Sequence, residues 1–127
     1  GHLGPNYDHA SVAQCEQALV RAGLMANIMI DCSHANSSKD HQRQPLVARD
    51  VADQIKAGNR SVMGLMLESN INAGSQKLSG DTTGLAYGVS VTDACIDWPT
   101  TATLLRDLDR ELRDVLPGRL RMRAHAA

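Results

Sequence analysis

The chain has 127 residues, of which 43% are hydrophobic and 21% charged, and its net charge is −1. These values fit one modest globular domain with a real core, and they give no general affinity for nucleic acid or a membrane surface. With one Trp, two Tyr and no Phe, the chain has few aromatic side chains for a base-stacking platform, so we expect no nucleic-acid partner. No apolar run approaches the ~20 residues that cross a bilayer, so we expect no membrane partner.

The cysteines indicate a reducing compartment. Their number is odd and they lie far apart in the chain, at Cys15, Cys32 and Cys95. A disulfide framework would favour an even number, so we expect a reduced protein of the cytoplasm.

The first predicted helix runs from about Asp8 to about Ala22. Asp8 is a suitable N-cap, and Gly23 suits the position that closes a helix. Helical spacing predicts one buried face, formed by Val12, Cys15 and Leu19. The short apolar run that follows predicts a strand over 27–33.

A second helix is predicted over about 41–57. Its apolar face repeats every four residues, at Val47, Val51 and Ile55. Pro45 must lie in its first turn or make the helix start late, and Gly58 ends it.

A second strand is predicted over 61–67, where a near-continuous apolar run indicates a strand covered on both faces. The segment 69–96 is rich in glycine and reads as a long loop, and a loop of this length in a compact domain is usually functional. The last helix is predicted over about 99–115. Its expected buried stripe is Leu104, Leu105, Leu108, Leu112 and Val115.

The end of the chain is expected to be irregular. Pro117-Gly118 should stop the last helix, and the short basic tail 119–123 reads as a frayed end rather than a binding arm.

Each predicted strand is followed by a helix, so the fold class is α/β with a parallel sheet. Two strands alone leave both edges of a sheet open. The chain must therefore pair with copies of itself or be a piece of a larger α/β protein. The start at Gly1 rather than Met, and the wholly apolar strands, favour the piece.

Polar residues gather where each strand ends, which is where α/β folds place their chemistry. The stretch 31–39 follows the first strand and contains His34, which can bind a metal or move a proton at neutral pH. Glu68 follows the second strand. Each residue could instead have a purely structural role. His34 could be a surface or core histidine whose ring is hydrogen-bonded within the protein. Glu68 could cap the loop or form an ion pair with Lys39 or Arg60.

Four runs carry a resemblance to a known family. They are Gly-Pro-Asn-Tyr-Asp-His at 4–9, Asp-Cys-Ser-His-Ala-Asn-Ser-Ser-Lys-Asp-His-Gln-Arg-Gln-Pro at 31–45, Met-Leu-Glu-Ser at 66–69 and Leu-Ala-Tyr-Gly-Val-Ser-Val-Thr-Asp-Ala-Cys-Ile-Asp-Trp at 85–98. The chain resembles the C-terminal part of the class I 3-deoxy-D-arabino-heptulosonate 7-phosphate (DAHP) synthases. The resemblance implies a (β/α)₈ TIM barrel, of which residues 1–127 would be one C-terminal fragment with the last two strands and last three helices.

The resemblance also implies an activity. The family is a transferase that condenses phosphoenolpyruvate with erythrose 4-phosphate and releases phosphate, the first step of the shikimate pathway to aromatic amino acids. It requires a divalent metal, which polarises the aldehyde of the sugar phosphate. The metal ligands implied here are His34, Glu68 and Asp93, with a cysteine from a segment that precedes this chain. Such a mixed site suits Mn, Fe, Co or Zn. We expect the full-length protein to be a homo-oligomer.

Other readings remain open at single positions. Asp93 could be a turn or cap residue ahead of the last helix. Cys32 lies two residues before His34 and, judged by spacing alone, could be the thiolate ligand. The resemblance argues against that, because the family's cysteine ligand comes from an earlier segment, and Cys95 reads as packing under the last helix.

The resemblance places the family's phosphate- and carboxylate-binding Arg and Lys residues on the first six strands. We therefore assign no catalytic and no substrate-binding residue within this chain. The alternative functions are a fragment without catalysis that acts as a metal-binding or assembly module, and a relative of the 3-deoxy-D-manno-octulosonate 8-phosphate synthases. The continuation over 37–45 fits the second alternative poorly.

Overall fold

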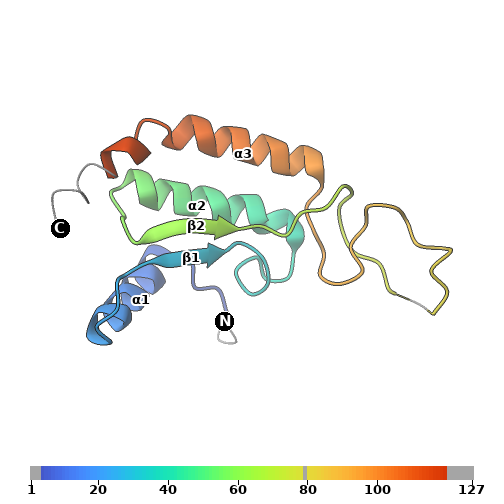
Figure 1. The fold of residues 1–127 in the computed structure, drawn as a ribbon, viewed down its shortest axis with the longest axis horizontal. Coiled ribbons are helices and arrows are strands. Elements are labelled where there is room, and N and C mark those ends of the chain that lie inside the picture. The colour runs from blue at the N-terminus through green and yellow to red at the C-terminus, as the bar shows by residue number, and fades with distance from the viewer. Residues whose placement is uncertain (1–3, 79, 120–127) are drawn as a thin grey trace.

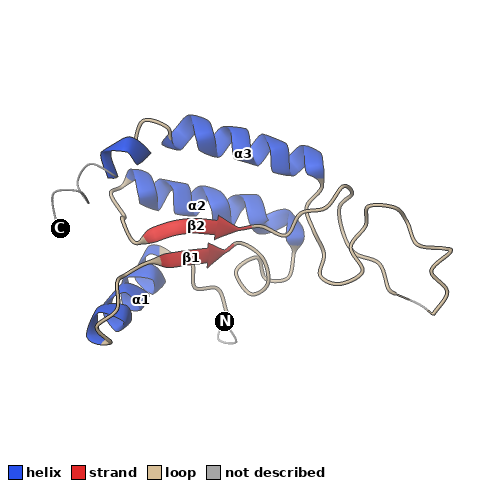
Figure 2. Ribbon diagram, in the orientation of Figure 1, coloured by secondary structure: helices blue, strands red, loops and turns tan. Residues whose placement is uncertain are grey.

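The structure is a computed structural model that describes residues 4–78 and 80–119. Its elements follow the predicted order of helix, strand, helix, strand, long loop and helix (Figures 1 and 2). They are α1 (His9–Arg21), β1 (Ile28–Asp31), the 3₁₀ turn η1 (His41–Arg43), α2 (Gln44–Lys56), β2 (Val62–Met66) and α3 (Trp98–Leu112).

The two strands form a parallel sheet, as predicted for an α/β fold. The register pairs Ile28 with Val62 and Asp31 with Met66, with one irregularity between Ile28 and Met29. Both strands therefore end at the same edge of the sheet, and the long loop projects beyond that edge (Figure 1). The strands are shorter than the predicted 27–33 and 61–67 because the chain turns into polar loops at this edge.

The hydrophobic core lies between one face of the sheet and the helices. Figure 1 shows α2 and α3 stacked beside β2, with α1 beside β1. The core takes alternate residues of β1 and one side of α2, with one residue each from α1 and β2 and two from α3. Its buried members are Val12, Ile28, Ile30, Cys32, Val47, Ala48, Val51, Ala52, Ile55, Val62, Leu104 and Leu112.

The other face of the sheet is open, and the prediction that the second strand is covered on both faces is wrong for this chain. Met29 is 68% exposed, Met63 54% and Met66 39%. No element within residues 4–78 and 80–119 covers these side chains. Because apolar area exposed to water costs about 25 cal/mol per Å², this face is a destabilising feature of the chain as it stands.

Helix α1 has the predicted ends. The Asp8 carboxylate accepts a hydrogen bond from the Ser11 backbone N–H at 3.0 Å, which satisfies an orphan donor of the first turn. Gly23 takes a φ of +70°, a left-handed conformation that favours glycine. Val12 is buried as predicted, but Cys15 is exposed. The buried face of α1 is therefore narrower than the helical spacing of its apolar residues predicted.

Helix α2 starts late, as Pro45 required. Residues 41–43 form a 3₁₀ turn capped by Asp40, and Pro45 lies in the first turn of the α-helix, where its missing N–H has no intrahelical role. The predicted stripe of Val47, Val51 and Ile55 is fully buried.

Helix α3 ends earlier than predicted. Asp97 caps it by accepting from the Thr100 N–H at 2.8 Å, and the last helical residue is Leu112 rather than Val115. Leu105 is 49% exposed, so its place in the predicted buried stripe is wrong.

The predicted stop at Pro117-Gly118 is also wrong. Residues 116–119 take a further helical turn that contains both residues. Proline is compatible with the first turn of a helix, so its presence here starts a turn instead of ending one. Residues 120–123 of the basic tail lie outside the described residues.

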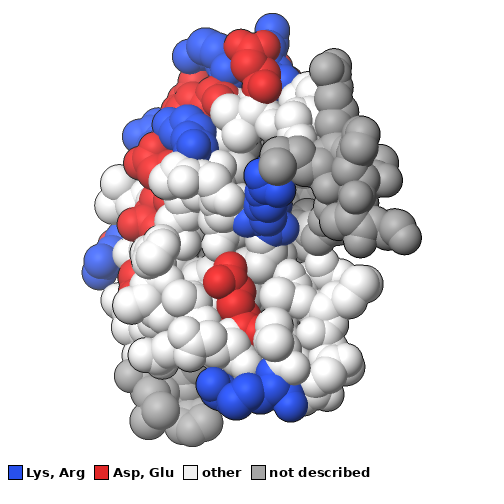
Figure 3. All heavy atoms as spheres, turned by 90° about the vertical axis from the view of Figure 1, so that its left-hand side faces the viewer, with Lys and Arg blue, Asp and Glu red and all other residues white. Residues whose placement is uncertain are grey.

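Ion pairs link the outer surfaces of α2 and α3. Lys56 Nζ lies 2.8 Å from Glu111 Oε2, and Arg49 Nη2 lies 3.6 Å from Asp107 Oδ2. Figure 3 shows acidic and basic side chains interleaved toward the top, where α3 lies. Within the described residues, no helix is both long enough and apolar enough to span a membrane.

Candidate metal site

The loop after β1 is held by its own hydrogen bonds. The backbone N–H of Ser37 donates to the Ser33 carbonyl at 3.3 Å, and that of Lys39 donates to the His34 carbonyl at 2.8 Å. The Asn36 side chain donates to the carbonyl of Asp31 at 2.8 Å, which ties the loop to the strand end. His34 takes a φ of +50°, an uncommon conformation for a residue other than glycine. The tight turn therefore fixes the backbone position from which its imidazole projects.

Glu68 follows β2 and is fixed by a residue of α2. Gln44 is fully buried, and its side-chain amide forms two hydrogen bonds with the Glu68 backbone. Gln44 Nε2 donates to the Glu68 carbonyl at 3.0 Å, and Gln44 Oε1 accepts from the Glu68 N–H at 2.8 Å. The start of α2 thus positions the end of the neighbouring strand.

Asp93 reaches the site because the long loop folds back on itself. Gly74 and Cys95 exchange backbone hydrogen bonds at 2.9 and 3.1 Å, and Ile96 N–H donates to the Glu68 carbonyl at 2.9 Å. Gly88 is required by the fold-back: its φ is +72°, and a Cβ there would lie 2.7 Å from Ile71 Cβ. The glycine-rich loop thus brings Asp93 back to the strand ends.

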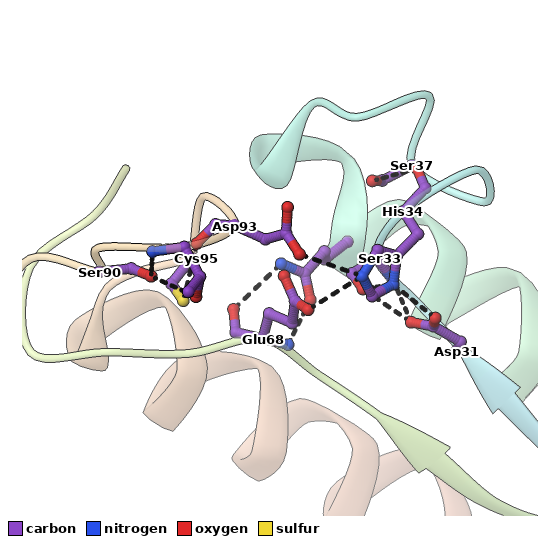
Figure 4. Close-up of polar contacts among 10 residues, drawn as sticks. Asp31, Ser33, His34, Ser37, Glu68, Ser90, Asp93 and Cys95 are labelled. Carbon is purple, nitrogen blue, oxygen red and sulfur yellow. Dashed lines mark hydrogen bonds and ion pairs between the residues drawn. The ribbon is translucent and has the colours of Figure 1, made fainter. Parts of the chain in front are cut away.

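The three residues predicted as metal ligands lie together at the carboxyl end of the sheet (Figure 4). His34 Nε2 is 3.3 Å from Glu68 Oε1 and 3.3 Å from Asp93 Oδ2. One ligand atom from each residue lies within 4.8 Å of the others. They line a small pocket of ≈ 130 Å³, which Lys39 and His41 also line.

A fourth side chain, Asp31, contacts the opposite nitrogen of the His34 ring. Asp31 Oδ2 lies 2.7 Å from His34 Nδ1, while Asp31 Oδ1 accepts from the Ser33 backbone N–H and from Ser33 Oγ, both at 2.8 Å. Asp31 was not among the predicted site residues. The signal for it is an acidic residue three positions before a candidate ligand histidine, at the end of a strand.

The charges around His34 favour a cation at this position. The hydrogen bond that the His34 ring donates to Asp31 raises the pKa of His34 above its ordinary value, and Glu68 and Asp93 add to the effect. Burial works to raise the pKa of Asp31, but hydrogen bonds from Ser33 and His34 outweigh it and lower that pKa. Carboxylates that converge on one nitrogen repel each other unless a proton or a metal ion lies between them.

The two cysteines nearest in sequence do not join the cluster. Cys32 is 0% exposed and belongs to the hydrophobic core, on the helix side of the sheet. Burial raises the pKa of its thiol to about 12, which disfavours the thiolate that binds metals. Cys95 is buried too, and burial raises the pKa of its thiol.

The donor set fits a divalent transition metal. One imidazole nitrogen and two carboxylate oxygens are presented from three different chain segments, within the spread that a single ion can bridge. The second nitrogen of the imidazole is hydrogen-bonded to a carboxylate, as is usual for metal-binding histidines.

Comparison with known proteins identifies relatives of this chain. Residues 1–106 match the profile of the DAHP synthetase I family. The chain is 54% identical over 120 residues to the Tyr-sensitive phospho-2-dehydro-3-deoxyheptonate aldolase of Enterobacter agglomerans, covering 94% of this chain and 56% of that protein. It is 52% identical over 120 residues to the Tyr-sensitive enzyme of the same name from Escherichia coli K12, covering 94% of this chain and 34% of that protein.

A solved structure shows the same arrangement of elements. The phospho-2-dehydro-3-deoxyheptonate aldolase of Francisella tularensis SCHU S4 superposes with a TM-score of 0.82 at 40% identity, covering 89% of this chain and 32% of that one. The chain thus spans between about a third and about half of the length of these relatives. The matched profile covers most of the sequence, and the chain therefore belongs to the DAHP synthetase I family.

Proposed function

We propose that residues 1–127 are the C-terminal part of a (β/α)₈ barrel, with its last two strands and last three helices. The parallel pair β1–β2, with helices on one face only, is what two neighbouring strands of such a barrel would contribute. The exposed face that carries Met29, Met63 and Met66 would then line the barrel interior. The coverage of 32–34% of the longer relatives supports the same reading.

The longer enzyme would condense phosphoenolpyruvate with erythrose 4-phosphate to give DAHP and phosphate, the first step of aromatic amino acid biosynthesis. The observation that carries this proposal is the convergence of His34, Glu68 and Asp93 at the strand ends of a chain of this family. Barrel enzymes hold their catalytic groups at this end of the strands.

His34, Glu68 and Asp93 would hold a divalent ion, one of Mn, Fe, Co or Zn, together with a cysteine from a segment outside this chain. When bound, the ion would supply Lewis-acid polarisation of the sugar-phosphate aldehyde. The residues themselves supply position: His34 is set by its turn and by Asp31, and Glu68 by Gln44. Asp93 is held by the folded loop, so the three donors are in place before an ion arrives.

The anionic groups of the substrates need cationic side chains to bind them, and these side chains would come from segments outside this chain. We assign no residue here to substrate binding, and we propose that the complete protein is a homo-oligomer. The cytoplasmic location expected from the cysteine pattern stays a prediction.

The test uses the complete protein that contains this chain. His34→Ala, Glu68→Ala and Asp93→Ala are each expected to weaken metal binding in calorimetry and to abolish metal-dependent phosphate release from the two substrates. Asp53→Ala is the matched control, because Asp53 is an exposed acid near the end of α2 that pairs with Lys56. Unchanged stoichiometry and affinity in all three variants would refute the site.

The same experiment separates the proposal from a metal-binding module without catalysis. Metal binding that depends on the three residues, in a complete protein that releases no phosphate from the two substrates, would support the module instead.

A further inference from the structure

The inference concerns Asp31, and it rests on the proposed metal site. We propose that Asp31 is a positioning residue that fixes the tautomer and the direction of the His34 imidazole, so that Nε2 presents its lone pair to the ion. Asp31 does not itself touch the ion in this arrangement. It lies on the far side of the ring from Glu68 and Asp93 (Figure 4).

The hydrogen-bond pattern assigns the tautomer. Asp31 Oδ2 is an acceptor and lies 2.7 Å from His34 Nδ1, so Nδ1 must carry the proton. Ser33 Oγ also lies 2.7 Å from Nδ1 and already donates its hydrogen to Asp31 Oδ1 at 2.8 Å, so it too can only accept from Nδ1. In the neutral ring the proton on Nδ1 leaves Nε2 bare, and Nε2 is the atom that faces Glu68 and Asp93 at 3.3 Å.

The Asp31 carboxylate is itself held in place. Its Oδ1 accepts two hydrogen bonds from Ser33, one from the backbone N–H and one from Oγ. Its Oδ2 is thereby directed to His34, and the strand end supplies a rigid base because the Asp31 carbonyl accepts from Asn36. The positive φ of His34 brings its ring back over Asp31, three residues earlier in the chain.

This pattern makes Asp31→Asn an informative change. Every group around the carboxylate donates: the Ser33 N–H, the Ser33 hydroxyl and the Nδ1–H of His34. An amide has one oxygen, so either orientation of asparagine points its NH₂ at a donor. If the NH₂ faces His34, Nδ1 becomes the acceptor and the proton moves to Nε2, where it blocks the metal.

The first measurement needs no variant. In the complete, metal-free protein labelled with ¹⁵N-histidine, the imidazole nitrogen shifts report which nitrogen carries the proton when the ring is neutral. The expected result for His34 is the Nδ1–H tautomer, with His34→Gln used to assign its signals. A His34 ring with its proton on Nε2 would overturn the proposal, whatever the variants do.

The second measurement is metal affinity, with Mn²⁺ or Zn²⁺ alone as the probe. Asp31→Asn is expected to weaken binding about 10–100-fold, the usual effect of removing a partner of a ligating histidine, and to raise the share of the Nε2–H tautomer. Asp53→Asn is the control and should change neither. An unfolding midpoint equal to that of the wild-type protein checks that the Asp31→Asn variant folds. Asp31→Glu keeps the carboxylate and should recover part of the lost metal affinity.

The outcomes separate this inference from the proposed function. If His34→Ala leaves metal affinity unchanged, the metal site itself is wrong. If His34→Ala removes binding while Asp31→Asn keeps both the wild-type affinity and the wild-type tautomer, the site stands and the role of Asp31 is refuted.

Discussion

Gln44 offers a sharp test of how the fold positions Glu68. Its side chain is fully buried at the start of α2, and both of its amide groups bind the Glu68 backbone, at 3.0 and 2.8 Å. Gln44→Met keeps a similar length and volume but removes both hydrogen bonds. The change therefore probes the polar contact with little change in packing.

The expected loss of stability depends on which hydrogen bonds the Glu68 backbone keeps in the Gln44→Met variant. The Glu68 carbonyl keeps a second donor, the Ile96 N–H at 2.9 Å, so its loss is that of an ordinary hydrogen bond, about 0.5–1.5 kcal/mol. Gln44 is the partner shown for the Glu68 N–H, and a donor left unsatisfied costs about 1–3 kcal/mol. Together the free energy of unfolding should fall by about 1.5–4.5 kcal/mol.

The assay is denaturant unfolding of the complete protein, with metal affinity measured in parallel. Gln42→Met is the matched control, because Gln42 is exposed two residues earlier and should cost less than about 0.5 kcal/mol. Metal binding should weaken as well, because a shift of the Glu68 backbone would also move the Glu68 carboxylate. Equal denaturant midpoints for the two variants would refute the reasoning.

Three further outcomes are expected. Cys32→Ser should keep metal affinity and activity, because Cys32 is buried on the helix side of the sheet; a large loss of bound metal in calorimetry would show that it is a ligand. The 127-residue chain expressed alone should unfold without a sharp thermal transition and make no product, because its open face exposes Met29, Met63 and Met66; a cooperative monomer with turnover would contradict this. In the metal-free protein, the raised pKa of His34 means that its stabilising contribution is full below about pH 6.5 and is lost as the pH rises through the raised value; the unfolding midpoint should show that loss, and His34→Ala should remove it.

Local features of the sequence were enough to predict the order of the helices and strands, and the positions of two candidate metal ligands. The four-residue repeat of Val47, Val51 and Ile55 predicted the buried side of α2, because that period matches one face of a helix. Asp8 and Gly23 marked the ends of α1, since capping depends on side-chain type and backbone freedom at single positions. The apolar runs that end in polar residues predicted where His34 and Glu68 would lie.

Only the tertiary structure decided which of these groups meet. Asp93 reaches His34 through a loop whose path depends on pairings such as Gly74 with Cys95, between residues far apart in the sequence. The exposure of Leu105 and the open face at Met29 depend on what packs against each surface, which no local period records. The role of Asp31 required the left-handed turn at His34, because spacing alone does not say which way a ring points. Gln44 binds Glu68 across 24 residues of chain, a contact that exists only once α2 lies against the sheet.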